Sequence, residues 1–133
     1  MSEPLETDEQ RRAAGMRVRR EVLGDAHVDR AVAAVTTFTA DFQDFITRVA
    51  WGDVWQRPGL SRRERSIATL SITIALRHCD EFALHVRAGV NNGLTDDDIA
   101  EVLQHAAVYA GVPAANHAYK VAGPILAELR ADD

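Results

Sequence analysis

Apolar side chains recur every three or four residues along most of this chain, which predicts amphipathic helices rather than strands. The first periodic stretch predicts a helix over residues 9–23, ended by Gly24 and Asp25. The next predicts one long helix over residues 27–50. Glycine and proline then break the period in residues 51–59, which we expect to be a loop or irregular turn carrying both tryptophans.

The second half of the chain repeats the helical pattern with clearer boundaries. Ser61 and Glu64 form a capping-box pattern that opens a helix. The period could run on to Val90, but about thirty residues is too long for an average helix, so we predict a break between Arg77 and Asp80, with Asp80 as a good N-cap. Two more helices are predicted, over residues 95–110 and 113–129. No strand pattern is present, so the expected fold is all-α, with about six helices.

The candidate chemistry lies in residues 77–85, Arg-His-Cys-Asp-Glu-Phe-Ala-Leu-His. In a helix, His78, Glu81, Phe82 and His85 would share one face. Two imidazoles and a carboxylate on an apolar stripe indicate proton chemistry. We expect Glu81 to hydrogen-bond His85, which would raise the imidazole pKa and fix its tautomer. The alternative is a surface ion pair worth less than about 1 kcal/mol.

Two other readings of this segment carry less weight. The spacing of His78, Glu81 and His85 resembles a metal-ligand set, but a single helix seldom supplies three ligands with good geometry. Cys79 is the only cysteine and has no CxxC partner, which excludes an intrachain dithiol. We therefore expect Cys79 to be an inert packing or surface residue.

Further binding candidates lie outside this segment. Arg57, in the tryptophan segment, is suited to carboxylate binding. Trp55 could cap the core or wall a pocket. Tyr109 and Asn116 flank a helix–turn–helix corner, where they either pack or line a cavity.

The remaining arginines look less specific. Arg17, Arg19 and Arg20 could hold an anion, but a solvated helix face is the expected role. Arg62 and Arg63 are expected to be exposed at a helix start.

Composition narrows the class of protein. The 133 residues carry 15 Lys+Arg against 20 Asp+Glu, which argues against a nucleic-acid partner. One cysteine, an acidic N-terminus without a signal-peptide core and no long apolar run predict a cytoplasmic protein that does not span a membrane. We expect a flexible tail over residues 1–8 and a single domain over residues 9–133. Abundant alanine and valine favour a homo-oligomer over a compact monomer.

Four stretches together resemble the carboxymuconolactone decarboxylase family. They are residues 22–30, residues 51–60 with Arg65 and Ser66, residues 80–87 and residues 109–116. They span nearly the whole chain and point to the γ-carboxymuconolactone decarboxylase branch. The resemblance implies an all-helical bundle of the alkylhydroperoxidase D-like type, assembled as a homo-oligomer, commonly a hexamer. In the peroxidase branch a CxxC precedes a histidine. Aligned on His85, those two cysteines fall on His78 and Glu81, so the resemblance excludes disulfide redox chemistry.

The activity implied by the resemblance is decarboxylation of 4-carboxymuconolactone to 3-oxoadipate enol-lactone and CO₂ in the β-ketoadipate pathway of protocatechuate catabolism. No cofactor or metal is implied, because the lactone carbonyl accepts the electrons. On this basis His85 is expected to be the general acid, held by Glu81, with His78 as an oxyanion or carboxylate donor. Exchanging the two histidines fits equally well.

The same resemblance suggests where the substrate binds. Arg57 and the helix start near Asp80 are candidates for the retained carboxylate, Trp55 and Tyr109 for pocket walls, and Asn116 for a further contact. Two rivals stay open: a lactone isomerase, and a non-catalytic oligomeric module.

Overall fold

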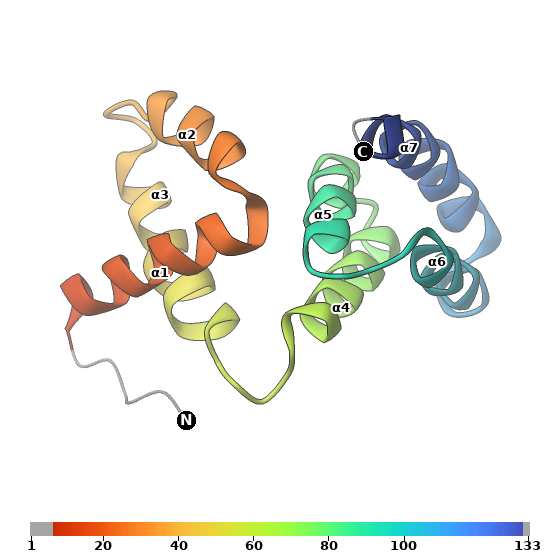
Figure 1. Cartoon of the computed structure of the whole chain (residues 1–133), viewed down its shortest axis with the longest axis horizontal. Helices are drawn as coiled ribbons and strands as arrows, with labels where there is room; N and C mark the ends of the chain where they lie inside the picture. The colour runs from red at the N-terminus through yellow and green to blue at the C-terminus, as the bar shows by residue number, and fades with distance from the viewer. Residues whose placement is uncertain (1–6, 132–133) are drawn as a thin grey trace. The chain divides into compact units, whose positions relative to one another are not determined.

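The computed structural model describes residues 7–131 and contains no strand within them. Most of the expected tail, residues 1–6, lies outside the described part. The helices, labelled as in Figure 1, are α1 (Asp8–Leu23), α2 (Asp25–Ala33), α3 (Ala40–Ile46), the π-helix η1 (Thr47–Trp55), α4 (Arg62–Ala75), α5 (Cys79–Asn91), α6 (Asp96–Ala110) and α7 (Val112–Ala131). The all-α prediction is confirmed for these residues. None of these helices is long and apolar enough to cross a membrane.

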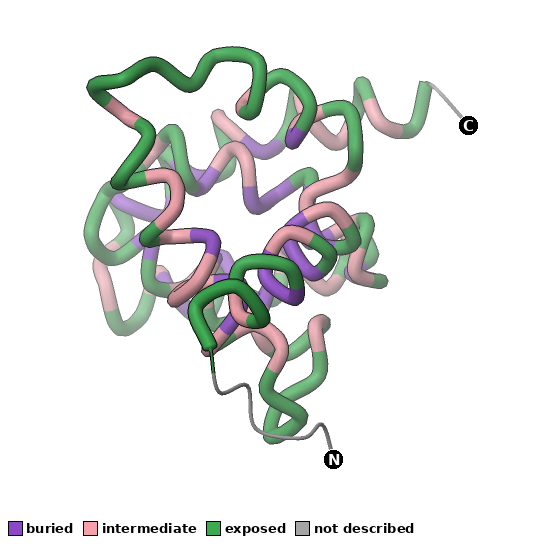
Figure 2. Tube along the Cα trace, turned by 90° about the vertical axis from the view of Figure 1, so that its left-hand side faces the viewer, coloured by how far each residue is buried: buried purple, intermediate pink, exposed green. Residues whose placement is uncertain are grey.

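The described part of the chain forms two compact units, which divide between Arg62 and Arg63. Each has its own buried side chains, and Figure 2 shows buried and exposed residues alternating along the helices. The single domain expected from residue 9 onward stays a prediction.

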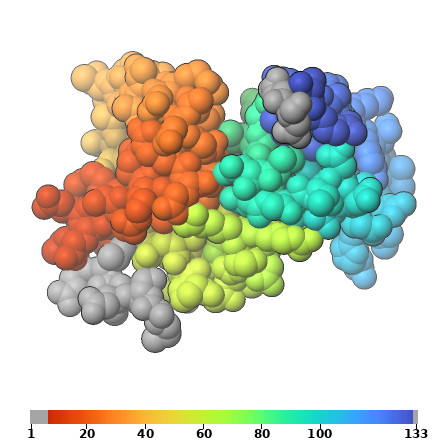
Figure 3. Space-filling model, viewed as in Figure 1, coloured from red at the N-terminus to blue at the C-terminus, as the bar shows by residue number. Residues whose placement is uncertain are grey.

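The first unit is built on a close crossing of α1 and η1. Gly15 of α1 lies against the carbonyl of Thr47, and a Cβ on Gly52 would lie 2.5 Å from the carbonyl of Arg11. Side chains at these two positions would push the helices apart. Arg11 also donates to both carboxylate oxygens of Asp53, at 3.1 Å each. Figure 3 shows α1 and α2, red to orange, side by side at the surface of this unit.

The single helix expected over residues 27–50 is wrong. The chain leaves the α-helix after Ala33 and re-enters it at Ala40. Between them, the backbone N–H of Thr36 donates to the Thr39 hydroxyl at 3.0 Å, and the Thr39 N–H donates to the Thr36 carbonyl at 3.1 Å. Threonine hydroxyls compete with helical hydrogen bonds in this way, so the turn replaces a turn of helix.

The irregular turn expected over residues 51–59 is wrong for its first part. Residues Thr47–Trp55 form a π-helix that continues from α3 and carries both tryptophans. The rings of Trp51 and Trp55 lie 5.2 Å apart between centroids. Because one extra residue per turn shifts the apolar period, a search for the α-helical period reads this segment as irregular.

The second unit has one apolar core, to which α4, α5, α6 and α7 all contribute. Its buried members are Leu70, Ile74, Phe82, Val86, Leu94, Ile99, Val102, Leu103, Ala106, Ala114, Ala118 and Ala122. Helix α7 packs against both α5 and α6. Thr95 caps α6 through a complete capping box with Asp98, as expected for a helix that begins there.

Candidate functional site

The corner between α4 and α5 positions the candidate histidines. Helix α4 ends at Ala75 and α5 begins at Cys79, which confirms the predicted break. The N-cap of α5 is His78 rather than Asp80, and its side chain makes no capping hydrogen bond. Arg77 takes a left-handed backbone conformation, with φ 57°, and this turns the chain before Asp80 is reached.

His85 is the buried member of the predicted acid–base face. It lies in α5 with 6% of its surface exposed, whereas His78 and Glu81 are exposed. Glu81 lies in the first turn of α5, where the helix dipole favours a carboxylate. Its pairing with His85 stays a prediction.

The three side chains do not form a metal-ligand cluster. Within residues 7–131, no group of three or more His, Cys, Asp and Glu side chains is arranged to hold a metal ion. His78, Glu81 and His85 therefore share a helix start without converging on one point.

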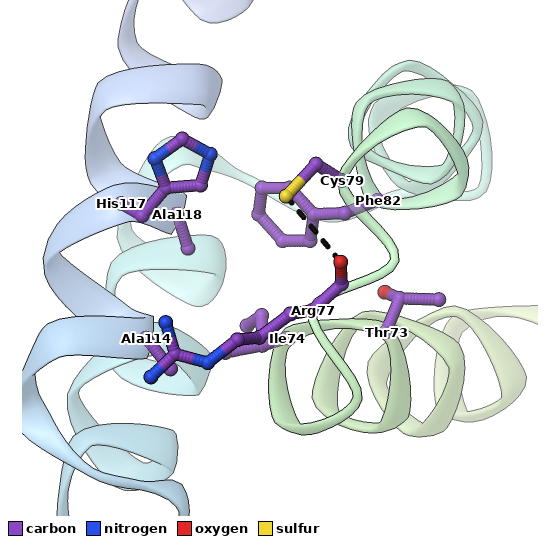
Figure 4. A pocket seen from close by; sticks show the side chains of 8 residues that line it. All are labelled: Thr73, Ile74, Arg77, Cys79, Phe82, Ala114, His117 and Ala118. Carbon is purple, nitrogen blue, oxygen red and sulfur yellow. Dashed lines mark hydrogen bonds between the residues drawn. The ribbon is translucent and has the colours of Figure 1, made fainter.

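A cavity of about 230 Å³ opens beside this corner, on the side of α5 that faces α7 (Figure 4). Its lining residues are Thr73, Ile74, Arg77, Cys79, Phe82, Ala114, His117 and Ala118. The floor is apolar, and the Arg77 guanidinium extends from the corner toward α7. A guanidinium and an imidazole around an apolar floor can bind a small organic carboxylate.

Cys79 lines the same cavity rather than lying in the core. The thiol is half-buried, and its Sγ donates to the Arg77 carbonyl at 3.5 Å. The sequence places no second cysteine beside it, since the chain has only one. Its side chain therefore forms part of one wall of the cavity.

The two candidates near the α6–α7 corner do not line this cavity. Tyr109 is 81% exposed, stacks near His105 with centroids 5.0 Å apart, and borders a separate groove of about 260 Å³ between α4 and α6. Asn116 is exposed on α7, while the next residue, His117, reaches the cavity.

The other two candidates belong to the first unit. Trp55 is the last residue of η1 and is half-buried beside Trp51. Arg57 is exposed, and its backbone N–H donates to the Val54 carbonyl at 3.1 Å.

Sequence reasoning missed two residues that line the cavity, His117 and Arg77, and misplaced Arg19. His117 has a detectable signal, because it lies three residues after Ala114 and one before Ala118, at the edge of the buried stripe of α7. Arg77 has no such signal in the sequence, because its position depends on a left-handed backbone conformation that is unusual for a residue other than glycine. Arg19, expected on a solvated face, is buried with 7% exposure. The solvated-face prediction is wrong for that residue and correct for Arg17, which is exposed.

Comparison with known proteins shows which family the chain is similar to. The model of the carboxymuconolactone decarboxylase family matches residues 40–123. A 4-carboxymuconolactone decarboxylase of Acinetobacter baylyi is 47% identical over 122 residues, covering 92% of this chain and 91% of the relative. A nitrosuccinic acid decarboxylase of Metarhizium robertsii is 48% identical over 99 residues, covering 74% of this chain and 69% of the relative. A 4-carboxymuconolactone decarboxylase of Pseudomonas putida is 56% identical over 46 residues, covering 35% of this chain and 96% of the relative.

Proposed function

The chain belongs to the carboxymuconolactone decarboxylase family, and from this membership we propose that it decarboxylates 4-carboxymuconolactone to 3-oxoadipate enol-lactone and CO₂. This reaction is a step of the β-ketoadipate pathway of protocatechuate catabolism. The observation that carries the proposal is the identity to the Acinetobacter baylyi enzyme along 92% of the chain. A buried histidine in α5 supplies a group suited to the proton transfer that the reaction requires.

The reaction needs electron delocalisation and one proton transfer. The bond between the ring carbon and the departing carboxylate breaks, CO₂ leaves, and the electron pair moves through the ring double bond onto the lactone carbonyl. The resulting dienolate takes a proton at the carbon next to that carbonyl. The lactone is its own electron sink, so we propose that no organic cofactor or metal takes part.

We assign the proton donor to His85. Its imidazole is 6% exposed, and a buried donor keeps bulk water from the carbanionic carbon. Water returns the proton to His85 at the end of the cycle. His78, exposed at the start of α5, is assigned to the dienolate oxygen or a carboxylate, with Glu81 as a solvated charge nearby.

The retained carboxylate has three candidate partners. Arg77 in the cavity and the free N–H groups at the start of α5 are in the second unit, and Arg57 is in the first. We keep Trp55, Tyr109 and Asn116 as substrate-binding proposals.

We also propose that the enzyme works as a cytoplasmic homo-oligomer, with a hexamer as the expected form. Large apolar side chains are exposed in each unit. In the first they include Phe38 at 94% and Phe42 at 61%, and in the second Val108 at 77% and Val112 at 69%. Apolar surface of this extent is typical of an interface between subunits.

The decisive experiment is an assay of the purified protein, treated with a strong chelator, on 4-carboxymuconolactone. CO₂ release with formation of the enol-lactone is expected at an undiminished rate after chelation. Turnover without CO₂ would indicate the lactone isomerase, and no turnover by a folded oligomer would indicate a non-catalytic module. A rate lost on chelation and restored by one divalent ion would contradict the cofactor-free mechanism.

Substrate choice is tested in the same assay with 2-nitrosuccinate. The relative from Metarhizium robertsii is named for that acid, so it is the natural competitor. We expect kcat/KM to favour the lactone, in line with the longer match to the Acinetobacter baylyi enzyme.

A further inference from the structure

Arg19 is a buried cation in the first unit. It lies on α1 with 7% of its surface exposed, and burial lowers the pKa of its guanidinium, with the like charge of Arg20 adding to the effect. A buried charge is costly unless an opposite charge or several hydrogen bonds accompany it. The question is therefore what balances Arg19.

Within the described residues, no ion pair includes Arg19. Its Nη2 donates to the neutral amide oxygen of Gln43 at 3.3 Å, and its Nε, also buried, has no hydrogen-bond acceptor. By contrast, the neighbouring Arg20 donates to Asp25 at 3.1 Å and to Asp29 at 2.8 Å. Arg19 thus keeps a donor available for an anion, whereas the charge of Arg20 is already paired with two carboxylates.

Asp44, which lines the same groove as Arg19, is a carboxylate that is already in use. Asp44 accepts from Nε of Arg12 and from Nε of Arg48, the latter at 2.8 Å. These two guanidiniums lower the pKa of Asp44 to about 2, which shows how firmly they hold its charge. Asp44 is therefore not the counter-ion of Arg19.

Arg19 lines an open groove of about 320 Å³, to which α1, α2 and α3 contribute lining residues. The other lining residues are Arg12, Met16, Val32, Val35, Gln43, Asp44 and Thr47. The lining carries two guanidiniums against one carboxylate, so its sign is positive. Met16, Val32 and Val35 give it apolar walls, and its volume is in the range of small-molecule sites.

We propose that this groove is a binding site for a small organic carboxylate, with Arg19 pairing the carboxylate and the methionine and valines covering its apolar body. A guanidinium fork is suited to a carboxylate, and desolvation strengthens the pair. The proposal is independent of the decarboxylation, because it rests on residues of the first unit alone. A chain inactive on the lactone is still expected to bind the carboxylate.

The test is a titration of the full chain, labelled with ¹⁵N-arginine, with sodium benzoate. The Nε–H resonance of Arg19 is identified by its loss in Arg19→Gln. We expect it to shift saturably with benzoate and to stay fixed with benzyl alcohol, which has the same ring without the charge. In calorimetry, Arg19→Gln is expected to weaken benzoate binding at this site by about tenfold or more.

Arg17→Gln is the matched control, because it removes the same charge from an exposed position of the same helix. It should leave the affinity within about twofold of the wild type. An Arg19 resonance that benzoate does not move would overturn the proposal, and so would equal affinities in Arg19→Gln and wild type. The proposal would also be overturned if benzoate did not bind and Arg19→Gln had a lower molar mass than the wild type in light scattering. Those two results would mean that a second copy of the chain supplies the carboxylate that pairs with Arg19. If Arg19→Gln does not fold, Arg19→Lys assigns the resonance and the wild-type titration decides.

Discussion

Replacing His85 tests the assignment of the proton donor. His85→Gln keeps a side chain of similar size and a hydrogen-bond donor in the buried site but cannot transfer a proton at neutral pH. A positioned general acid contributes roughly 10²–10⁴ in rate, which is about 2.7–5.4 kcal/mol of barrier. We expect kcat on the lactone to fall within that range while KM changes little.

From the structure we expect a much smaller effect on activity from replacing Glu81 than from replacing His85. Because Glu81 is exposed, solvent screens the effect of its charge on the imidazole. An exposed pair is worth less than about 1 kcal/mol, or less than about 0.7 of a pH unit. The protonated acid is needed, so activity falls as pH rises. Removing the negative charge in Glu81→Gln should shift that alkaline limb down by no more than this amount.

The assay is steady-state CO₂ release across pH 5–9, with circular dichroism and light scattering to check each variant. His105→Gln is the control, because His105 is exposed on α6 and contacts Tyr109 instead. Near-normal turnover in His85→Gln with a dead His78→Gln would invert the assignment. If both variants stay active, the acid–base reading of this face is refuted. A shift of a full unit or more in Glu81→Gln would mean that a Glu81–His85 pair forms in the working enzyme.

Three further changes test other parts of the structure. Cys79→Ser should keep most of the decarboxylase activity, since the thiol only contacts the Arg77 carbonyl, and the wild type should show no dithiol-dependent peroxide reduction in a coupled assay. Thr95→Ala removes the hydroxyl that caps α6 and should lower the free energy of unfolding in urea by about 1 kcal/mol, whereas an unchanged midpoint would show the cap to be dispensable. Arg12→Gln should raise the pKa of Asp44 from about 2 toward 3.8 in a ¹³C NMR titration of the carboxyl. Since that pKa is depressed by folding, the stabilisation is present above about pH 3.8 and is lost as pH falls through about 2.

The helices that the sequence predicted well have both a regular apolar period and a local stop signal. Helix α6 begins after Thr95 and ends before Gly111, as its capping residues indicate. The failures in the first unit have a common cause. The turn at Thr36 to Thr39 and the π-helix Thr47–Trp55 change how many residues make one turn, while the apolar residues continue at similar spacing. Periodicity records spacing and does not record which carbonyl each N–H selects.

In the candidate site, too, one feature could be predicted from the sequence and another could not. His85 could be found from sequence, because it sits among apolar residues of α5 and a helix places it three residues after the buried Phe82. The Glu81–His85 pair could not be judged, because i,i+4 spacing allows the contact without requiring it.

Arginine is the residue type whose burial is hardest to predict from the pattern of apolar and polar residues. A search for apolar stripes counts Arg19 as polar and assigns it to water, yet its long aliphatic stem allows a helix to bury it. The net charge of the chain also leads to an underestimate of anion binding. The chain carries a formal charge of −5, which argues against anionic partners as a whole, but charges beyond about 8–10 Å are screened at physiological salt. An anion that enters the groove beside Arg19 meets two guanidiniums and one occupied carboxylate, so the local sign opposes the global one. For a protein whose proposed substrate and proposed second ligand are both carboxylates, binding is therefore decided by which arginines are desolvated rather than by how many acids lie on the surface.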